Sequence, residues 1–211
     1  VNKKVKNMKK LLTCFLMLSL LTGCGGRTHD EKNTTSSVTS EKQLTITNTV
    51  ELDSERDDMS GYSWITGETG VFNKVTLEES IRLFAENGTG VIYFGYVGCP
   101  WCERAVPELN KVMVELNLPV YYVDASIKPS DEVYDNLIKY VGDDLKQEDG
   151  EPVFYVPYVV GVKNGKITKS QTALVSDYTI KDTSDASDQM NDSQKKELQD
   201  IYRSIFESVA D

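Results

Sequence analysis

Histidine and long apolar runs are scarce in this sequence, and each scarcity excludes a class of site. The 211 residues include one histidine, His29, which stands in a strongly polar segment. A structural zinc site needs four ligands, so zinc binding by the cysteines is not expected. The most apolar stretch, residues 11–21, is too short for a transmembrane helix, which needs about 20 residues. We therefore expect neither a metal site nor a permanent membrane-spanning anchor.

Positive charge is also in short supply. The chain has 23 Lys and Arg against 33 Asp and Glu, which gives a formal net charge of −10. A surface with this excess of acid repels phosphate backbones, so nucleic acid is not an expected partner.

Residues 1–23 have the pattern of an export signal. Lysines precede the apolar run at 11–21, whose length suits a cleaved secretory signal. The run ends in Leu21-Thr22-Gly23-Cys24, which resembles a bacterial lipobox. This resemblance implies that residues 1–23 are removed and that Cys24 carries acyl chains, palmitate among them, on the outer face of the cell membrane. An ordinary signal peptide with an incidental Cys24 is the alternative.

The remaining chain divides into a polar segment and one domain. Residues 24–60 are rich in Ser, Thr, Asp, Glu and Lys, a composition typical of a flexible tether. Within them, the alternating Leu44-Thr45-Ile46-Thr47 is open to a strand interpretation, but we assign it to the tether. We expect the folded domain to span residues 61–211, with no internal repeat.

Apolar periodicity predicts the elements of this domain. Thr76, with Glu79 three residues later, is a capping-box pattern that predicts a helix to about residue 87. A β-α-β unit follows, with buried strands at 91–96 and 120–124 around a helix that starts at the cysteines. A helix at about 130–146 comes next, then a loop at 147–150. Strands at 153–162 and 166–174 form an antiparallel hairpin through Asn164-Gly165, and the last helix spans about 193–209.

Cys99-Pro100-Trp101-Cys102 is the motif that carries chemistry. Cys14 lies in the leader and Cys24 in the lipobox, so the domain holds only this pair. If the helix starts here, Cys99 is the N-cap, Pro100 is N1 and Cys102 is N3. Backbone N–H groups and the helix dipole then lower the pKa of Cys99, by roughly one to one and a half units. Cys99 would act as nucleophile and Cys102 would resolve the mixed disulfide, closing a redox-active Cys99–Cys102 bond.

The next two residues carry opposite charges whose effects on Cys99 oppose each other. Glu103 would disfavour the thiolate and Arg104 would favour it, but solvated first-turn charges are the preferred interpretation of both. A zinc site, a static disulfide and an unreactive reduced pair are the alternatives for the cysteines themselves.

The motif and its surroundings resemble the thioredoxin fold over roughly residues 76–172. The resemblance rests on three features: the apolar strand before the cysteines, Pro107 five residues after Cys102, and Val156-Pro157 ahead of the Asn164-Gly165 hairpin. The resemblance implies an α/β fold with a central mixed sheet flanked by helices. It also implies a cis peptide bond at Pro157, and substrate binding by Pro100, Trp101, Val156 and Pro157.

Two departures accompany this resemblance. Tyr93 stands where thioredoxins place a buried acid, so the carboxylate proton relay of the family is not carried over; water, Tyr93 or Glu103 are the open substitutes. A helical insertion lies between Asp124 and Val153, before the cis-proline strand, and a polar stretch follows Ser176.

Taken together, the lipobox and the cysteine motif make the chain resemble extracytoplasmic thiol-disulfide oxidoreductases of Gram-positive bacteria, including the bacteriocin transport accessory protein family. We therefore expect a membrane-anchored enzyme that exchanges disulfides with secreted proteins or peptides, without a cofactor beyond its own disulfide. A redox partner in the membrane is a further expected contact. The alternatives are a non-catalytic accessory protein that binds an exported peptide or its transporter, and an electron-transfer protein served by a membrane donor.

Overall fold

The fold is an α/β domain built on one mixed sheet. A computed structural model describes residues 43–211, so the predicted signal, Cys24 and the tether up to residue 42 lie outside the described residues. Six strands form the sheet in the order β1-β2-β4-β3-β7-β8, and a two-stranded sheet pairs β5 with β6. The strands are β1 (Glu55–Asp57), β2 (Phe72–Val75), β3 (Gly90–Gly95), β4 (Val120–Asp124), β5 (Lys146–Glu148), β6 (Glu151–Val153), β7 (Tyr158–Lys163) and β8 (Lys166–Thr172).

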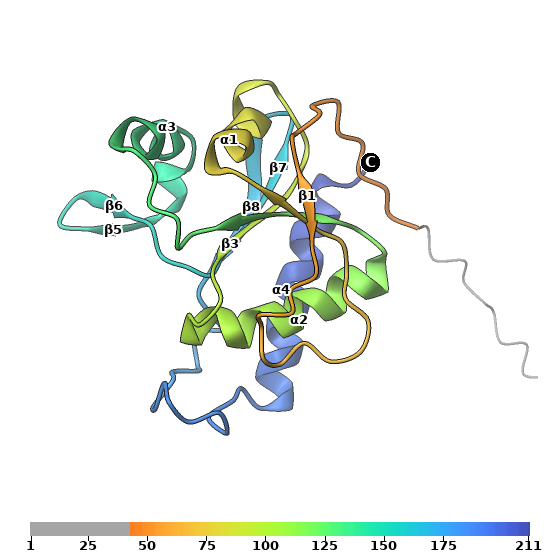
Figure 1. The fold of residues 1–211 in the computed structure, drawn as a ribbon, viewed down its shortest axis with the longest axis vertical. Helices are drawn as coiled ribbons and strands as arrows, with labels where there is room; N and C mark the ends of the chain where they lie inside the picture. Colours follow the sequence, from red (N-terminus) through yellow and green to blue (C-terminus); the bar gives the residue numbers. More distant parts are fainter. Residues whose placement is uncertain (1–42) are drawn as a thin grey trace, which may run out of the picture. The chain divides into compact units, whose positions relative to one another are not determined.

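Helices cover both faces of the main sheet (Figure 1). They are α1 (Leu77–Ala85), α2 (Pro100–Leu116), α3 (Asp131–Val141), the 3₁₀ turn η1 (Gly142–Asp144) and α4 (Asp192–Val209). The predicted mixed sheet flanked by helices is thus confirmed. Among these helices of residues 43–211, none combines the length and the apolarity that crossing a bilayer requires.

The middle of the sheet is the predicted β-α-β unit. β3 and β4 are parallel, with Ile92 opposite Tyr121, and α2 connects them. β2 is also parallel to β4, whereas β7 pairs antiparallel with β3 and places Tyr158 opposite Phe94. The carboxyl ends of β2, β3 and β4 therefore meet at the same edge of the sheet as the start of β7.

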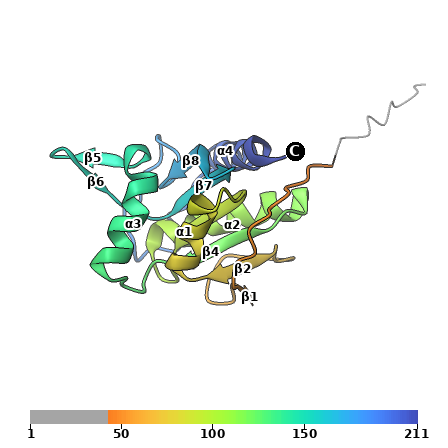
Figure 2. The ribbon, with the colours of Figure 1, turned by 90° about the horizontal axis from the view of Figure 1, so that it is seen from above.

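Alternation along β3 divides the core into two layers, as the period of two in a strand requires. Val91 and Tyr93 pack in the cluster that contains both cysteines and the buried sides of α2 and α4. Ile92 and Phe94 pack on the opposite face, with Leu83 of α1 among others. Figure 2 shows α1 and α3 together on that face.

Side-chain caps begin α1 and α4, at Thr76 as the sequence predicts and at Asn191, for which the sequence analysis gives no cap. Thr76 accepts a hydrogen bond from the N–H of Glu79 at 3.1 Å, and Asn191 caps α4 in the same way through Gln194 at 2.9 Å. The predicted hairpin is also confirmed: Asn164 and Gly165 have φ of 51° and 73°, the left-handed pair that a type I′ turn needs.

Residues 43–60 differ from the predicted tether. Val50, Leu52 and Met59 are buried, and β1 pairs with β2. The N–H of Asp211 donates to the carbonyl of Thr45 at 2.9 Å, which joins this segment to the end of the chain. The segment folds onto the domain because its apolar residues alternate with polar ones, so that the apolar side chains pack against the core. The domain boundary predicted at residue 61 is therefore placed too late.

The region between β4 and β7 also departs in detail from the sequence analysis. The predicted helix at 130–146 ends at Val141 and continues as η1, and the predicted loop at 147–150 contains the end of β5 and the turn of the β5–β6 hairpin. Asp149 and Gly150 both have positive φ, as a tight hairpin turn requires.

Candidate active site

A tight turn delivers the two cysteines to the start of α2. β3 ends at Gly95, and Gly98 has φ of 87°, a conformation that glycine adopts without a Cβ penalty. Cys99 is the N-cap of α2 and Pro100 its first residue, as the sequence predicts. The N–H of Cys102 donates to Sγ of Cys99 at 3.3 Å. The motif therefore holds both sulfurs at the positive end of a 17-residue helix.

Both cysteines are free thiols, the reduced form of the predicted couple. The exposed fraction is 3% for Cys99 and 0% for Cys102. Only Cys99 therefore has solvent-exposed surface. This arrangement suits a nucleophile that meets the substrate and a resolving thiol that lies behind it.

The pKa values of the two thiols are driven apart. Hydrogen bonds from the Cys102 thiol and from the N–H groups of Cys102 and Trp101 lower the pKa of Cys99 to about 7, against burial and the charge of Glu103. The same contact with Cys99, together with burial, raises the pKa of Cys102 far above its ordinary value. At neutral pH a large fraction of Cys99 is thiolate while Cys102 keeps its proton.

Tyrosines surround Cys102 on its inner side. The hydroxyls of Tyr93 and Tyr62 lie 3.0 Å apart in a buried hydrogen bond, and the ring of Tyr93 stacks on Tyr122 at 5.5 Å. Burial, followed by the charge on Cys102, raises the pKa of Tyr93 well above its ordinary value. Tyr93 is therefore a proton donor at neutral pH, and a side-chain hydrogen bond from it favours the Cys102 thiolate. The hydroxyl of Tyr202 is also buried, and it has no hydrogen-bond partner within residues 43–211.

Glu103 ties the cysteine turn to the segment at 59–64. Its Oε1 accepts from the N–H of Gly98 at 3.0 Å, and its Oε2 accepts from the N–H of Ser63 at 2.9 Å. The carboxylate is buried, which corrects the preference for a solvated first-turn charge. It satisfies one backbone donor of the cysteine turn and one of the segment at 59–64, and this is the physical reason for its position.

Arg104 is buried as well, and it holds the polar stretch after Ser176. Its guanidinium donates to the carbonyls of Asp188 at 2.7 Å, Asp185 at 3.1 Å and Pro100 at 2.9 Å. The ring of Trp64 lies 5.1 Å from the guanidinium carbon. The preference for solvation is again wrong, because the loop at 176–191 supplies backbone acceptors that its polar sequence does not reveal.

The predicted substrate-binding residues lie at this end of the sheet. The Val156–Pro157 peptide bond is cis, as predicted, and leads directly into β7. Val156 packs against both layers of the core, Pro157 is buried, and Pro100 is half-buried. Trp101 is 40% exposed, so its ring offers an apolar surface beside the thiols.

Sequence reasoning missed the roles of Tyr62, Glu103 and Arg104. Tyr62 is separated from Tyr93 by 31 positions, and no local pattern predicts that their hydroxyls meet. The one available signal is the position of Glu103 and Arg104 in the first turn of a helix with an apolar face. Such a turn packs against neighbouring loops, which indicates that its charged side chains contact them.

Within residues 43–211, no group of three or more His, Cys, Asp or Glu side chains is arranged to hold a metal ion. Comparison with protein-family models and with curated proteins finds no match to this chain.

Proposed function

We propose that this protein is a thiol-disulfide oxidoreductase with a thioredoxin fold. The observation that carries the proposal is the pairing of Cys99 and Cys102 at the start of α2, where the pKa of Cys99 is lowered and that of Cys102 is raised. This division of roles suits a nucleophile and a resolving thiol.

Two exchange steps follow from these roles. The Cys99 thiolate attacks one sulfur of a substrate disulfide, so a Cys99–substrate bond forms while the substrate disulfide breaks and releases one thiolate, which takes a proton. Cys102 then loses its proton and attacks Sγ of Cys99. The Cys99–Cys102 disulfide forms and the second substrate thiol leaves, so the substrate gains two electrons and the protein loses them. The reverse sequence donates a disulfide, and both together isomerise one.

The thioredoxin assignment is supported by the order of elements around the site. The mixed sheet, Cys99 after the central strand β3 and the cis bond at Pro157 before β7 agree with the resemblance seen in the sequence. On this assignment α3, η1 and the β5–β6 hairpin form the insertion before the cis-proline strand. Val156, Pro157, Pro100 and Trp101 would hold an extended substrate backbone as an added strand.

The compartment is proposed from the sequence alone. An acylated Cys24 would anchor the protein to the outer face of the cell membrane, where secreted polypeptides are its substrates. Cys24→Ser should move the protein from the membrane fraction to the soluble fraction, and retention of this variant in the membrane would contradict the anchor.

Trapping of the intermediate tests the activity. The Cys102→Ser chain, incubated with glutathione disulfide, should accumulate a mixed disulfide on Cys99, detected by intact mass and peptide mapping. Cys99→Ser should not accumulate this mixed disulfide at a comparable rate. The native chain should form it only transiently, because Cys102 resolves it. Equal adduct formation by both variants would contradict the proposal, and full function in cells without either thiol would favour the non-catalytic accessory role.

A further inference from the structure

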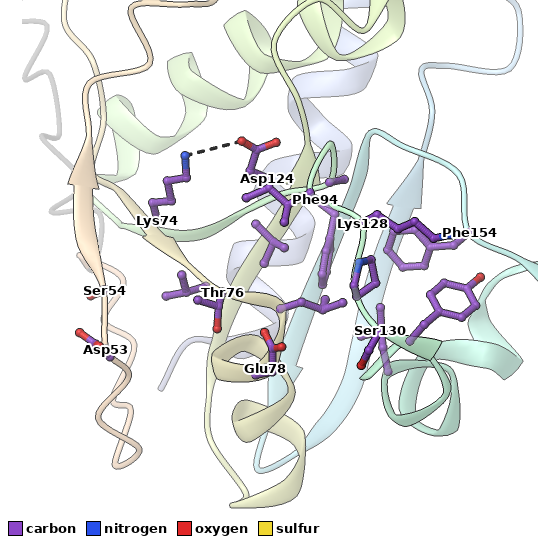
Figure 3. Close-up of a pocket in the computed structure, with 18 of the residues that line it drawn as sticks. Asp53, Ser54, Lys74, Thr76, Glu78, Phe94, Asp124, Lys128, Ser130 and Phe154 are labelled. Atoms are coloured by element: carbon purple, nitrogen blue, oxygen red, sulfur yellow. Dashed lines mark ion pairs between the residues drawn. The ribbon is translucent and has the colours of Figure 1, made fainter. Parts of the chain in front are cut away.

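A cavity of about 720 Å³ opens at the sheet edge where β2, β3 and β4 end, on the face opposite the cysteines. This volume is in the range of ligand-binding pockets, and α/β proteins usually bind ligands at this edge. Figure 3 shows the cavity between the start of α1, near Thr76, and the start of α3, near Ser130.

One wall of the cavity is apolar and continuous with the proposed substrate-binding segment. The rings of Phe94 and Phe154 pack edge to face with centroids 5.3 Å apart. Ile127, which also lines the cavity, is 66% exposed, and Tyr134 is 36% exposed. Large apolar side chains left in solvent together mark an interaction site. Phe154 precedes Val156 by two residues, so one short loop joins this wall to the cis bond.

The other wall carries an excess of negative charge. Asp53, Glu55, Glu78 and Asp124 line the cavity, with only Lys74 and Lys128 as cations. The Lys74 ammonium is 3.6 Å from Asp124 and 3.9 Å from a carboxylate of Asp57, so two acids share its charge.

Three carboxylates of this wall therefore face solvent without a cation. Within residues 43–211, Asp53, Glu55 and Glu78 form no ion pair. In Figure 3, Asp53 and Glu78 lie on the α1 side of the cavity, whereas Lys128 lies beside Phe154 and Ser130. A ligand at this site thus meets aromatic rings on one side and unpaired acids on the other.

We propose that the cavity is a specificity pocket for polypeptide substrates of the oxidoreductase, and the proposal rests on the function proposed above. It takes an apolar side chain of an extended segment, and flanking Lys or Arg residues of that segment face Asp53, Glu55 and Glu78. A second copy of this acidic chain or an anionic lipid surface would bring like charges together at the rim.

Binding of cysteine-free peptides tests the pocket separately from the redox chemistry. The probes are acetyl-Gly-Lys-Phe-Lys-Gly-amide, its Glu-Phe-Glu counterpart and its Lys-Ala-Lys counterpart, titrated calorimetrically into the full chain. The Lys-Phe-Lys peptide should bind about tenfold more tightly than either of the others, and the preference over Glu-Phe-Glu should shrink as salt is added.

Variants at exposed positions localise the binding. Glu78→Gln and Asp53→Asn should each weaken Lys-Phe-Lys binding about two- to fivefold. Ile127→Ser should weaken binding of both Phe-containing peptides alike. Glu207→Gln on α4, an exposed acid on the other face of the sheet, is the matched control and should change nothing.

The two proposals fail in different experiments. Equal affinity for the Lys-Phe-Lys and Glu-Phe-Glu peptides, or Lys-Phe-Lys binding that is indifferent to Glu78→Gln, Asp53→Asn and Ile127→Ser, would overturn the pocket. Exchange with glutathione disulfide, which is too small to need the cavity, should be unchanged in these variants; its absence from the native chain would overturn the oxidoreductase instead.

Discussion

The hydroxyls of Tyr62 and Tyr93 lie 3.0 Å apart, both buried, directly behind the resolving cysteine. Neither group is ionised at neutral pH, because burial raises both pKa values. The pair therefore acts as a chain of donors, and a side-chain hydrogen bond from Tyr93 favours the thiolate of Cys102.

Tyr93→Phe removes the last donor of this chain. A hydrogen bond to a charged group contributes about 1.5–3 kcal/mol, so its loss should raise the pKa of Cys102 further and reduce the fraction of its thiolate. Higher nucleophilicity offsets part of the lost thiolate, which leaves resolution about three- to tenfold slower. Quenched single-turnover samples should show a longer-lived Cys99 mixed disulfide. Tyr62→Phe, which acts only through Tyr93, should have a smaller effect. An unaltered lifetime in Tyr93→Phe would remove Tyr93 from the mechanism.

Glu103→Gln should change stability and reactivity in opposite directions. The amide has one carbonyl oxygen for the two backbone donors at Ser63 and Gly98, so unfolding in urea should cost about 1–3 kcal/mol less. Loss of the negative charge lowers the pKa of Cys99, so alkylation at pH 6 should accelerate. Glu132→Gln, on an exposed face of α3, should do neither. Slower alkylation at pH 6 would show that Glu103 acts on Cys99 only by holding the turn.

Arg104→Met should loosen the loop at 176–191 without removing it. Three carbonyls lose the hydrogen bond from the guanidinium, which predicts a loss of about 1–3 kcal/mol. Limited trypsin digestion should then cut after Lys181 much faster than in the native chain. Arg203→Met, which breaks a surface pair with Glu115, is the control and should leave this site protected. Equal cleavage in both would mean that the loop is held by other contacts.

The pH dependence of Cys99 follows from its lowered pKa. Iodoacetamide alkylation of the reduced protein should rise through a midpoint near pH 7 and level off above it, whereas an unperturbed thiol has its midpoint at about 8.5. Cys99→Ser should lose this phase, because the remaining thiol, Cys102, has no solvent-exposed surface. A midpoint at or above that of an unperturbed thiol would contradict the hydrogen bonding described here.

Stability of the reduced form should follow the same groups. Between pH 7 and about 8.5 the unfolded chain holds more protons at Cys99 than the folded chain, so the free energy of unfolding rises with pH. Above about 8.5 the unfolded Cys102 ionises while the folded one does not, and the gain from Cys99 is progressively offset. In the oxidised protein neither Cys99 nor Cys102 titrates, because both sulfurs are in the disulfide. Urea unfolding of both forms at pH 6.5, 8 and 9.5 tests the sign, and a reduced form that loses stability between pH 6.5 and 8 would contradict it.

Local signals predicted most of the framework around the cysteines. Thr76 and Asn164-Gly165 each determine a cap or a turn through their own backbone contacts, so neither needs tertiary information. The same holds for Cys99 as N-cap, since a proline at the first helical position loses no intrahelical hydrogen bond.

Features held by distant contacts were beyond this kind of prediction. Asp149-Gly150 is a hairpin signal, but the flanking residues of β5 and β6 are polar and lack alternation, so the sequence does not predict these strands. Leu44 and Ile46 do alternate with polar residues, yet their burial depends on a sheet built by later residues. The roles of Glu103 and Arg104 depend on loops that lie far from them in sequence.

A redox titration of the native chain tests the central claim most directly. In glutathione buffers of graded ratio, the fraction of the Cys99–Cys102 disulfide, measured by acid quench and mass, should follow one reversible two-electron transition that disappears in Cys99→Ser and in Cys102→Ser. Thiols that stay reduced across the whole range, or that form only separate glutathione adducts, would contradict the account.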